Sequence, residues 1–100
     1  MFYLKSIKKI DEQTIIEIAG RLDTNTAPAL EKAINENIDD TKNLVLDFKD
    51  IEYISSAGLR VLLGAQKKMQ QIGSMKLINV GESVMEVLEM TGFADILVIE

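Results

Sequence analysis

Apolar residues recur along this chain of 100 residues in two patterns, at every second position or at every third to fourth. Residues 2–10 and 13–20 contain many strand-forming residues and flank a tight turn at positions 11–12, which predicts a β-hairpin. In residues 27–38 the apolar positions are three and four residues apart, as on one buried face of a helix. This predicted face consists of Ala27, Leu30, Ile34 and Ile38.

The middle of the chain contains a short apolar run followed by an amphipathic segment. Residues 43–48 form a short, mainly apolar run, which is typical of a strand buried on both faces of a parallel sheet, and residues 49–54 are expected to be a short link. Residues 57–72 predict a second helix, ended by Gly73. Its buried side is expected to contain Leu59, Leu62, Leu63, Ala65, Met69 and Ile72. Its opposite side contains Arg60, Gly64, Lys67, Lys68 and Gln71.

The last third of the chain repeats this alternation. Residues 75–80 have the pattern of another buried strand, and residues 83–90 predict a third helix. Ser83 and Glu86 have the spacing of a capping box at the start of this helix. Residues 96–99 could add a last strand.

The predicted order is strand, strand, helix, strand, helix, strand, helix, strand. Such alternation favours a mainly parallel sheet with right-handed crossovers, to which the N-terminal hairpin adds an antiparallel edge. With 47% hydrophobic and 27% charged residues, a chain of this length is expected to form one globular domain. We therefore predict a single α/β domain over residues 1–100, with helices packed on a mixed, mainly parallel sheet.

Composition excludes several kinds of chemistry. The chain has no cysteine and no histidine, so it can form no disulfide, no thiolate or imidazole metal site and no Ser-His-Asp triad. Its net charge of −5 disfavours nucleic-acid binding. No apolar run is long enough to cross a bilayer, and the N-terminus lacks the layout of a signal peptide. We expect a cytoplasmic protein without a cofactor.

Ser55 and Ser56 stand between the apolar run and the second helix, in the stretch YISSAGLRVLLG. In open sheets of this class, sites lie beyond the carboxyl ends of strands, where loops lead into helices. One serine could cap the helix, which contributes about 1 kcal/mol. Alternatively, one could be phosphorylated, because a phosphate there meets free amides and the positive end of the helix dipole. Such a phosphate would spare the fold but repel a partner packed over this corner.

The polar loop RLDTNT also follows a strand and is expected to lie beside these serines. Asp23, Thr24 and Asn25 are common turn and cap residues. Thr24, Asn25 or Thr26 can cap the first helix, and Pro28 falls in its first turn, where its missing N–H is harmless.

Three segments resemble the STAS-domain anti-sigma factor antagonists, also called anti-anti-sigma factors. They are GRLDTNTAPALE, LVLDFKDIEYISSAGLRVLL and TGFADILVI, and the resemblance runs along nearly the whole chain. The middle segment is the most specific, because family members carry an aspartate-rich strand end followed by the pattern D/S-S-[AS]-G-L. The resemblance implies a STAS-like domain that works by partner switching.

In that family the anti-sigma factor is itself a serine kinase, and it phosphorylates the serine two residues before the glycine. Counted back from Gly58, the resemblance implies phosphorylation of Ser56, while Ser55 stands where the family often has aspartate. The unmodified protein would bind the kinase and free its sigma factor. Phosphorylation would break this complex, and a separate phosphatase would restore it.

The resemblance also implies a partner surface made by the loop before the first helix and the start of the second. The matching residues are Asp23, Thr24, Asn25, Ser55, Ser56, Ala57 and Gly58. Arg60 is added because it follows Ser56 by four residues and helical side chains lean toward the N-terminus, so it could reach a phosphate there. The alternative is a solvated surface arginine without such a contact. The protein is expected to be a monomer and not an enzyme.

Other readings of the sequence remain. Asp47 and Asp50 follow a buried strand, as in an aspartate-phosphorylated receiver, but receivers carry an acidic pair after the first strand, where this chain has a turn. No G-x-x-x-x-G-K loop is present, so the protein alone is not expected to bind nucleotide. STAS domains also serve in sensor complexes, lipid-transport systems and anion transporters, and the sequence leaves open another partner-switching circuit.

Overall fold

A computed structural model of the protein describes residues 2–100, with side chains from residue 4 onward. Its elements are β1 (Phe2–Ile10), β2 (Gln13–Leu22), α1 (Ala27–Asn37), β3 (Asn43–Ile54), α2 (Ser56–Ile72), β4 (Ser74–Ile78), α3 (Glu82–Met90) and the short 3-10 helix η1 (Phe93–Asp95). Among these helices, none is both long enough and apolar enough to cross a membrane.

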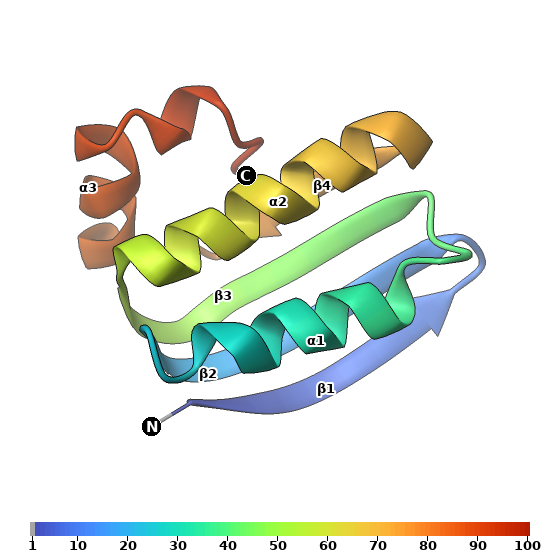
Figure 1. Ribbon diagram of the computed structural model, residues 1–100, viewed down its shortest axis with the longest axis horizontal. Coiled ribbons are helices and arrows are strands. Elements are labelled where there is room, and N and C mark those ends of the chain that lie inside the picture. Colours follow the sequence, from blue (N-terminus) through green and yellow to red (C-terminus); the bar gives the residue numbers. More distant parts are fainter. Residues whose placement is uncertain (1) are drawn as a thin grey trace.

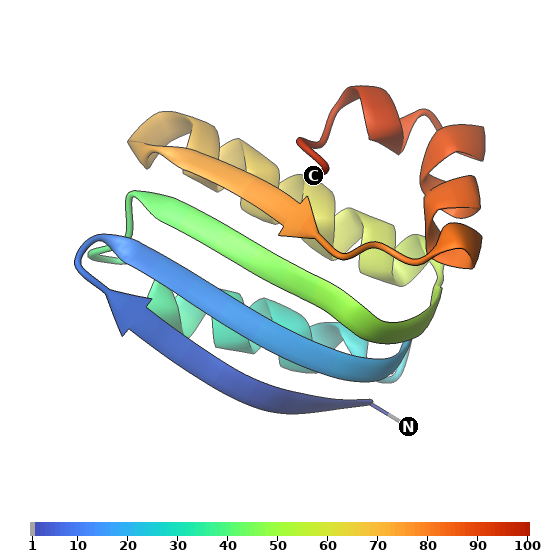
Figure 2. The ribbon, with the colours of Figure 1, turned by 180° about the vertical axis from the view of Figure 1, so that it is seen from behind.

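Within the described residues the strands form one mixed sheet in the order β1-β2-β3-β4. β1 and β2 make the predicted antiparallel hairpin, whereas β2 pairs with β3, and β3 with β4, in parallel. Figure 1 shows α1 and α2 lying side by side over one face of the sheet, and Figure 2 shows the opposite face without a helix. The α/β fold expected from the sequence is therefore confirmed.

The core lies between the sheet and these two helices. Phe48 and Leu46 of β3 are fully buried there, as are Leu62 and Met69 of α2. The predicted inner face of α1 is confirmed, since all four of its apolar residues are buried: Ala27, Leu30, Ile34 and Ile38. Ile72 was wrongly assigned to the buried side of α2. Its side chain is 41% exposed because it lies in the last turn, where the helix ends.

β3 is twice as long as predicted, because residues 49–54 continue the strand instead of forming a link. These residues were mistaken for a link because two bulges disturb the alternation of inward and outward side chains. Between Glu17 and Ala19, and again between Gly20 and Arg21, the paired stretch of β3 contains one residue more than that of β2. Each extra residue shifts the alternation, so the inward positions fall at every third residue. These buried side chains are Phe48, Ile51 and Ile54.

The C-terminal part of the fold differs from two expectations. α3 begins at Glu82 with Gly81 at the N-cap, so Ser83 already lies inside the helix and forms no capping box with Glu86. Residues 96–99 add a single parallel bridge beside Leu77 rather than a strand. The backbone turn of η1 occupies the residues before them, and only the last three residues reach the edge of β4.

Candidate functional site

The two loops singled out in the sequence leave the sheet at the same corner. β2 and β3 are parallel neighbours, and their last paired residues are Leu22 and Ile54. The N–H of Ser55 donates a hydrogen bond to the carbonyl oxygen of Leu22 at 2.9 Å. The loop that contains Asp23 therefore starts next to the two serines, as predicted.

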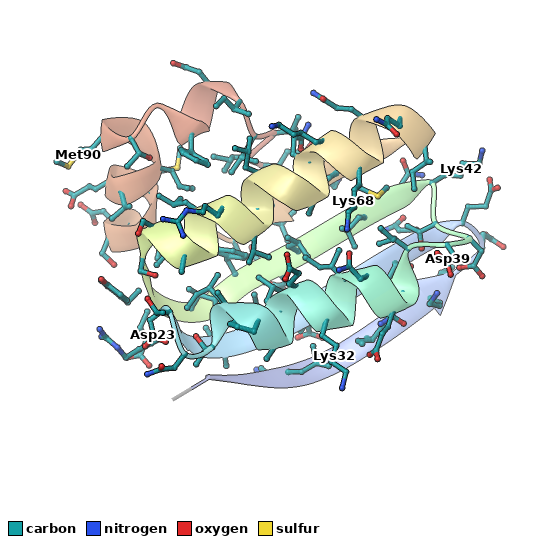
Figure 3. The ribbon with its side chains drawn as sticks, in the orientation of Figure 1. Asp23, Lys32, Asp39, Lys42, Lys68 and Met90 are labelled. Carbon is teal, nitrogen blue, oxygen red and sulfur yellow. The ribbon has the colours of Figure 1, made fainter. Side chains whose placement is uncertain are left out.

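Asp23 organises the loop before α1, beside the N-terminal end of that helix (Figure 3). Its Oδ1 accepts hydrogen bonds from the N–H groups of Asn25 (3.0 Å) and Thr26 (3.1 Å). Partial burial raises the pKa of the Asp23 carboxyl, but these bonds, the Thr26 hydroxyl and the charge of Arg21 outweigh burial and lower the pKa below its ordinary value. The turn thus holds an ionised carboxylate at the corner.

Thr26 occupies the N-cap of α1, but its side chain does not bond to the helix amides. Its hydroxyl instead donates to the carbonyl oxygen of Arg21 at 2.7 Å and accepts from the N–H of Asp23 at 2.8 Å. Thr24 and Asn25 are exposed at the tip of the loop. These hydrogen bonds hold the two ends of the loop together, and the exposed tip of the loop stays accessible to a partner.

Ser55 and Ser56 have different environments although they are adjacent. Ser55 is the N-cap of α2 with extended backbone, and its Oγ is buried without a hydrogen-bond partner among the described residues. The expectation that a serine oxygen caps this helix is therefore wrong. Ser56 is the first residue of α2 and is exposed. An enzyme can thus reach the hydroxyl of Ser56, whereas the oxygen of Ser55 is shielded.

The absence of a side-chain cap leaves the start of α2 open to an anion. The first backbone bond of the helix runs from the N–H of Leu59 to the carbonyl oxygen of Ser55, at 3.0 Å. By helix geometry, the N–H groups of Ala57 and Gly58 have no partner within the helix. A phosphate on Ser56 would therefore lie where helix amides and the dipole favour negative charge.

Gly58 has a packing role at this corner. A Cβ added there would lie 2.9 Å from Cγ1 of Ile54 and 2.9 Å from Cγ of Leu22, and both of these side chains are buried. α2 can begin this close to the ends of β2 and β3 only because residue 58 lacks a side chain. Gly58 is itself buried, and Ala57 beside it is partly buried against the core.

Arg60 is exposed one helical turn after Ser56, on the same side of α2. This position agrees with the geometry assumed for a contact between its guanidinium and a phosphate on Ser56.

One feature of the corner was missed from the sequence. The guanidinium carbon of Arg21 lies 4.2 Å from the centroid of the Tyr53 ring, in a cation–π contact. The two residues are paired across β2 and β3. Both had been placed outside strands, so no cross-strand neighbour could be assigned; recognising the bulges of β3 would have revealed the pair.

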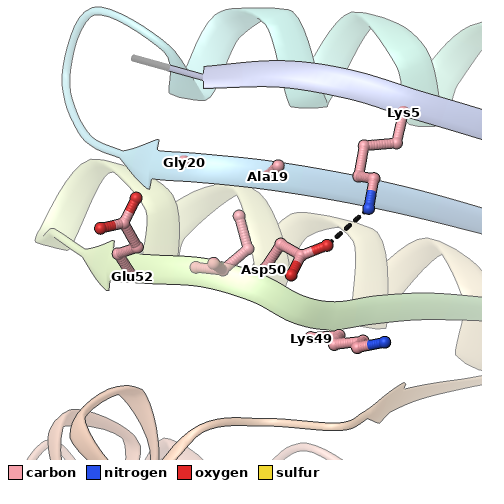
Figure 4. A pocket seen from close by; sticks show the side chains of 7 residues that line it. Lys5, Ala19, Gly20, Lys49, Asp50 and Glu52 are labelled. Carbon is pink, nitrogen blue, oxygen red and sulfur yellow. Dashed lines mark hydrogen bonds and ion pairs between the residues drawn. The ribbon is translucent and has the colours of Figure 1, made fainter.

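The aspartates weighed for a receiver-like site are engaged in structural contacts. Oδ1 of Asp47 accepts from the N–H of Lys49 at 3.0 Å and from the Asn79 side chain at 3.1 Å. Asp50 forms an ion pair with Lys5 on the helix-free face of the sheet, in an open depression of about 500 Å³ (Figure 4). The hydrogen bond from Lys5 lowers the pKa of Asp50. Asp47 and Asp50 thus bond to different partners.

Comparison with known sequences identifies the family. Residues 5–100 match the family model described as STAS domain. An anti-sigma-B factor antagonist of Bacillus subtilis (strain 168) is 32% identical over 92 residues, which make up 91% of this chain and 84% of the relative. The chain belongs to the STAS domain family, and the resemblance found in its sequence is confirmed.

Solved structures share the fold. An anti-sigma factor antagonist from Mycobacterium paratuberculosis superimposes with a TM-score of 0.88 at 24% identity, over 99% of this chain and 85% of the other. The Bacillus cell fate determinant SpoIIAA in the phosphorylated form gives a TM-score of 0.73 at 18% identity, over 100% and 91% of the chains. These likenesses confirm the architecture.

Proposed function

We propose that this protein is an anti-sigma factor antagonist that is switched by phosphorylation of Ser56. The observation that carries the proposal is the contrast at the start of α2, where the hydroxyl of Ser56 is exposed and the oxygen of Ser55 is buried. The relative from Bacillus subtilis is an anti-sigma factor antagonist, and SpoIIAA has been solved in a phosphorylated form, both of which support this assignment.

In the proposed cycle, the unmodified protein binds an anti-sigma factor that is also a serine kinase, and so frees a sigma factor. The contact would involve the loop tip at Thr24 and Asn25 together with the exposed start of α2. The kinase uses ATP to phosphorylate Ser56, and a phosphatase removes the phosphate. This domain acts as a cytoplasmic monomer without catalytic activity of its own. The lack of a phosphate-binding loop in the sequence supports that division of roles.

The direct test is phosphate transfer in vitro. Purified protein is incubated with each anti-sigma serine kinase of the same organism and ATP, and the modified residue is mapped by mass spectrometry. We expect one phosphate per chain, on Ser56. The Ser55→Ala variant should be phosphorylated normally and Ser56→Ala should not. Phosphate on Ser55, or no transfer from any such kinase, would contradict the proposal.

We also propose that Arg60 pairs with the phosphate. The Arg60→Ala variant should then reduce the stability of the phosphorylated protein by about 0.5 kcal/mol, as expected for an exposed pair one helical turn apart, and leave the unmodified protein unchanged. Urea denaturation of both forms measures the difference. Lys67→Ala, which removes another exposed cation from α2, is the control. Equal effects of the two variants would assign Arg60 to solvent.

A further inference from the structure

The outer face of α2 continues well beyond the proposed phosphorylation site. Residues four, eight, eleven and fifteen positions after Ser56 return to the same side of a helix. They are Arg60, Gly64, Lys67 and Gln71, and all except the partly buried Gly64 are exposed. This set, with Ser56, is called the α2 outer face below.

Gly64 has no packing role within the described chain. A Cβ added at Gly58 or Gly73 would collide with neighbouring atoms, whereas one added at Gly64 would meet nothing within 4 Å. Glycine in the interior of a helix is also less stable than alanine. The fold therefore gives no reason for a glycine at this position, and a reason outside the chain is indicated.

The missing side chain opens a small notch between α2 and α1. Its apolar lining comes from Ile34, Val61 and Ala65, and its rim includes Glu31. The notch measures about 70 Å³, far less than the roughly 300 Å³ of the smallest usual ligand pockets, so it fits one aliphatic side chain rather than a metabolite. Lys68 closes its other end by donating to Oδ1 of Asn35 at 2.6 Å, and Figure 3 shows it between the two helices.

The charge of α2 differs from that of the chain as a whole. The helix contains three basic residues and no acidic one, although the chain has a net charge of −5. The basic residues are Arg60, Lys67 and Lys68. A partner surface that carries carboxylates would complement this helix, and one that carries lysines would not.

We propose that the α2 outer face is a docking surface for an acidic segment of the anti-sigma factor, which inserts one apolar side chain into the Gly64 notch. This inference rests on the proposed function and extends its interface along the helix. It also explains how phosphorylation of one residue can weaken binding along the whole α2 outer face. A phosphate on Ser56 would add about −1.5 to −2 charge beside Arg60 and repel the carboxylates that this face attracts.

The test fills the notch. Gly64→Trp and Gly64→Gln are titrated calorimetrically with the purified anti-sigma factor that binds the unmodified wild-type protein. Both should bind at least tenfold more weakly, since the notch can no longer take the partner's side chain. Met90→Trp is the control, because the side chain of Met90 is 86% exposed on α3, outside the α2 outer face, and this variant should bind within about twofold of wild type.

Each outcome separates the two proposals. If no anti-sigma factor of the organism binds the wild-type protein, the proposed function fails and the docking surface with it. If the wild type binds, and Gly64→Trp and Gly64→Gln bind as tightly as the Met90→Trp control, the docking surface is wrong while the proposed function stands. Lys67→Glu should weaken binding at low salt, and an affinity unchanged by this charge reversal would rule out an acidic partner segment.

A second readout does not involve the partner. Gly64→Ala should raise the melting temperature by a few degrees, because alanine favours the helix and open space receives its methyl group. A lower melting temperature would show that the fold itself needs glycine at position 64, and the inference from its lack of a structural role would fall.

Discussion

The Ser56→Asp variant is expected to bind the anti-sigma factor at least tenfold more weakly than the wild-type protein and to fold normally. The exposed position of Ser56 at the first turn of α2 separates these two effects. A negative charge there is favoured by the helix dipole, by roughly 0.3–1 kcal/mol. The same charge facing a carboxylate across an interface costs several kcal/mol. The interface effect is therefore the larger one.

Phosphorylation should act more strongly than the aspartate substitution, because a phosphate carries about −1.5 to −2 charges and aspartate only one. A loss of about 3 kcal/mol in binding free energy corresponds to a more than hundredfold weaker complex. Calorimetric titration of unmodified, aspartate and phosphorylated protein against one anti-sigma factor should give this order. Circular dichroism and thermal melting of the same samples check that each one is folded.

Two controls make the result specific. Met90→Asp adds the same charge on α3 and should leave the affinity within about twofold of wild type. Ser56→Ala should bind as tightly as wild type but stay bound after ATP is added, because it cannot accept phosphate. An affinity for Ser56→Asp equal to that of wild type would show that no partner surface packs over this corner.

The position of the candidate site could be predicted from the sequence because it follows from the order of strands and helices along the chain. A strand ends and a leucine-rich helix begins within a few residues, so Ser55 and Ser56 had to lie at the corner where sites form in such sheets. Which serine is exposed could not be read, because it depends on a helix boundary known only to within one or two residues. In the structure, the extended backbone at Ser55 directs its oxygen inward, and the helix starts at Ser56.

The second half of β3 could not be predicted for a different reason. Two bulges place Phe48, Ile51 and Ile54 inward at intervals of three, a spacing that fits neither the period of a strand nor that of a helix. The cation–π contact between Arg21 and Tyr53 depends on the same register and was lost with it. Sequence patterns predict regular strands and helices well, whereas the second half of β3, beside the site, is irregular because of its bulges.

The Gly73→Ala variant is expected to lose about 3 kcal/mol of folding free energy, at the upper end of the range for overpacking. A Cβ at position 73 would lie 1.8 Å from the carbonyl oxygen of Lys42 and 2.6 Å from its carbonyl carbon. These are backbone atoms, so no rotamer change can relieve the contact. The same oxygen accepts a hydrogen bond from the N–H of Ser74 at 2.8 Å, at the start of β4.

Relief of this clash requires a shift of the connection between α2 and β4 away from the start of β3, which breaks that hydrogen bond and disturbs the parallel pairing behind it. For a domain of this size, 3 kcal/mol lowers the melting temperature by on the order of 15 °C. Differential scanning calorimetry measures the shift, and Gly64→Ala within α2 is the control, since its methyl group enters open space. If both variants melt at or above the wild-type temperature, then α2 does not pass this close to Lys42, because only at Gly73 does the added methyl group overlap backbone.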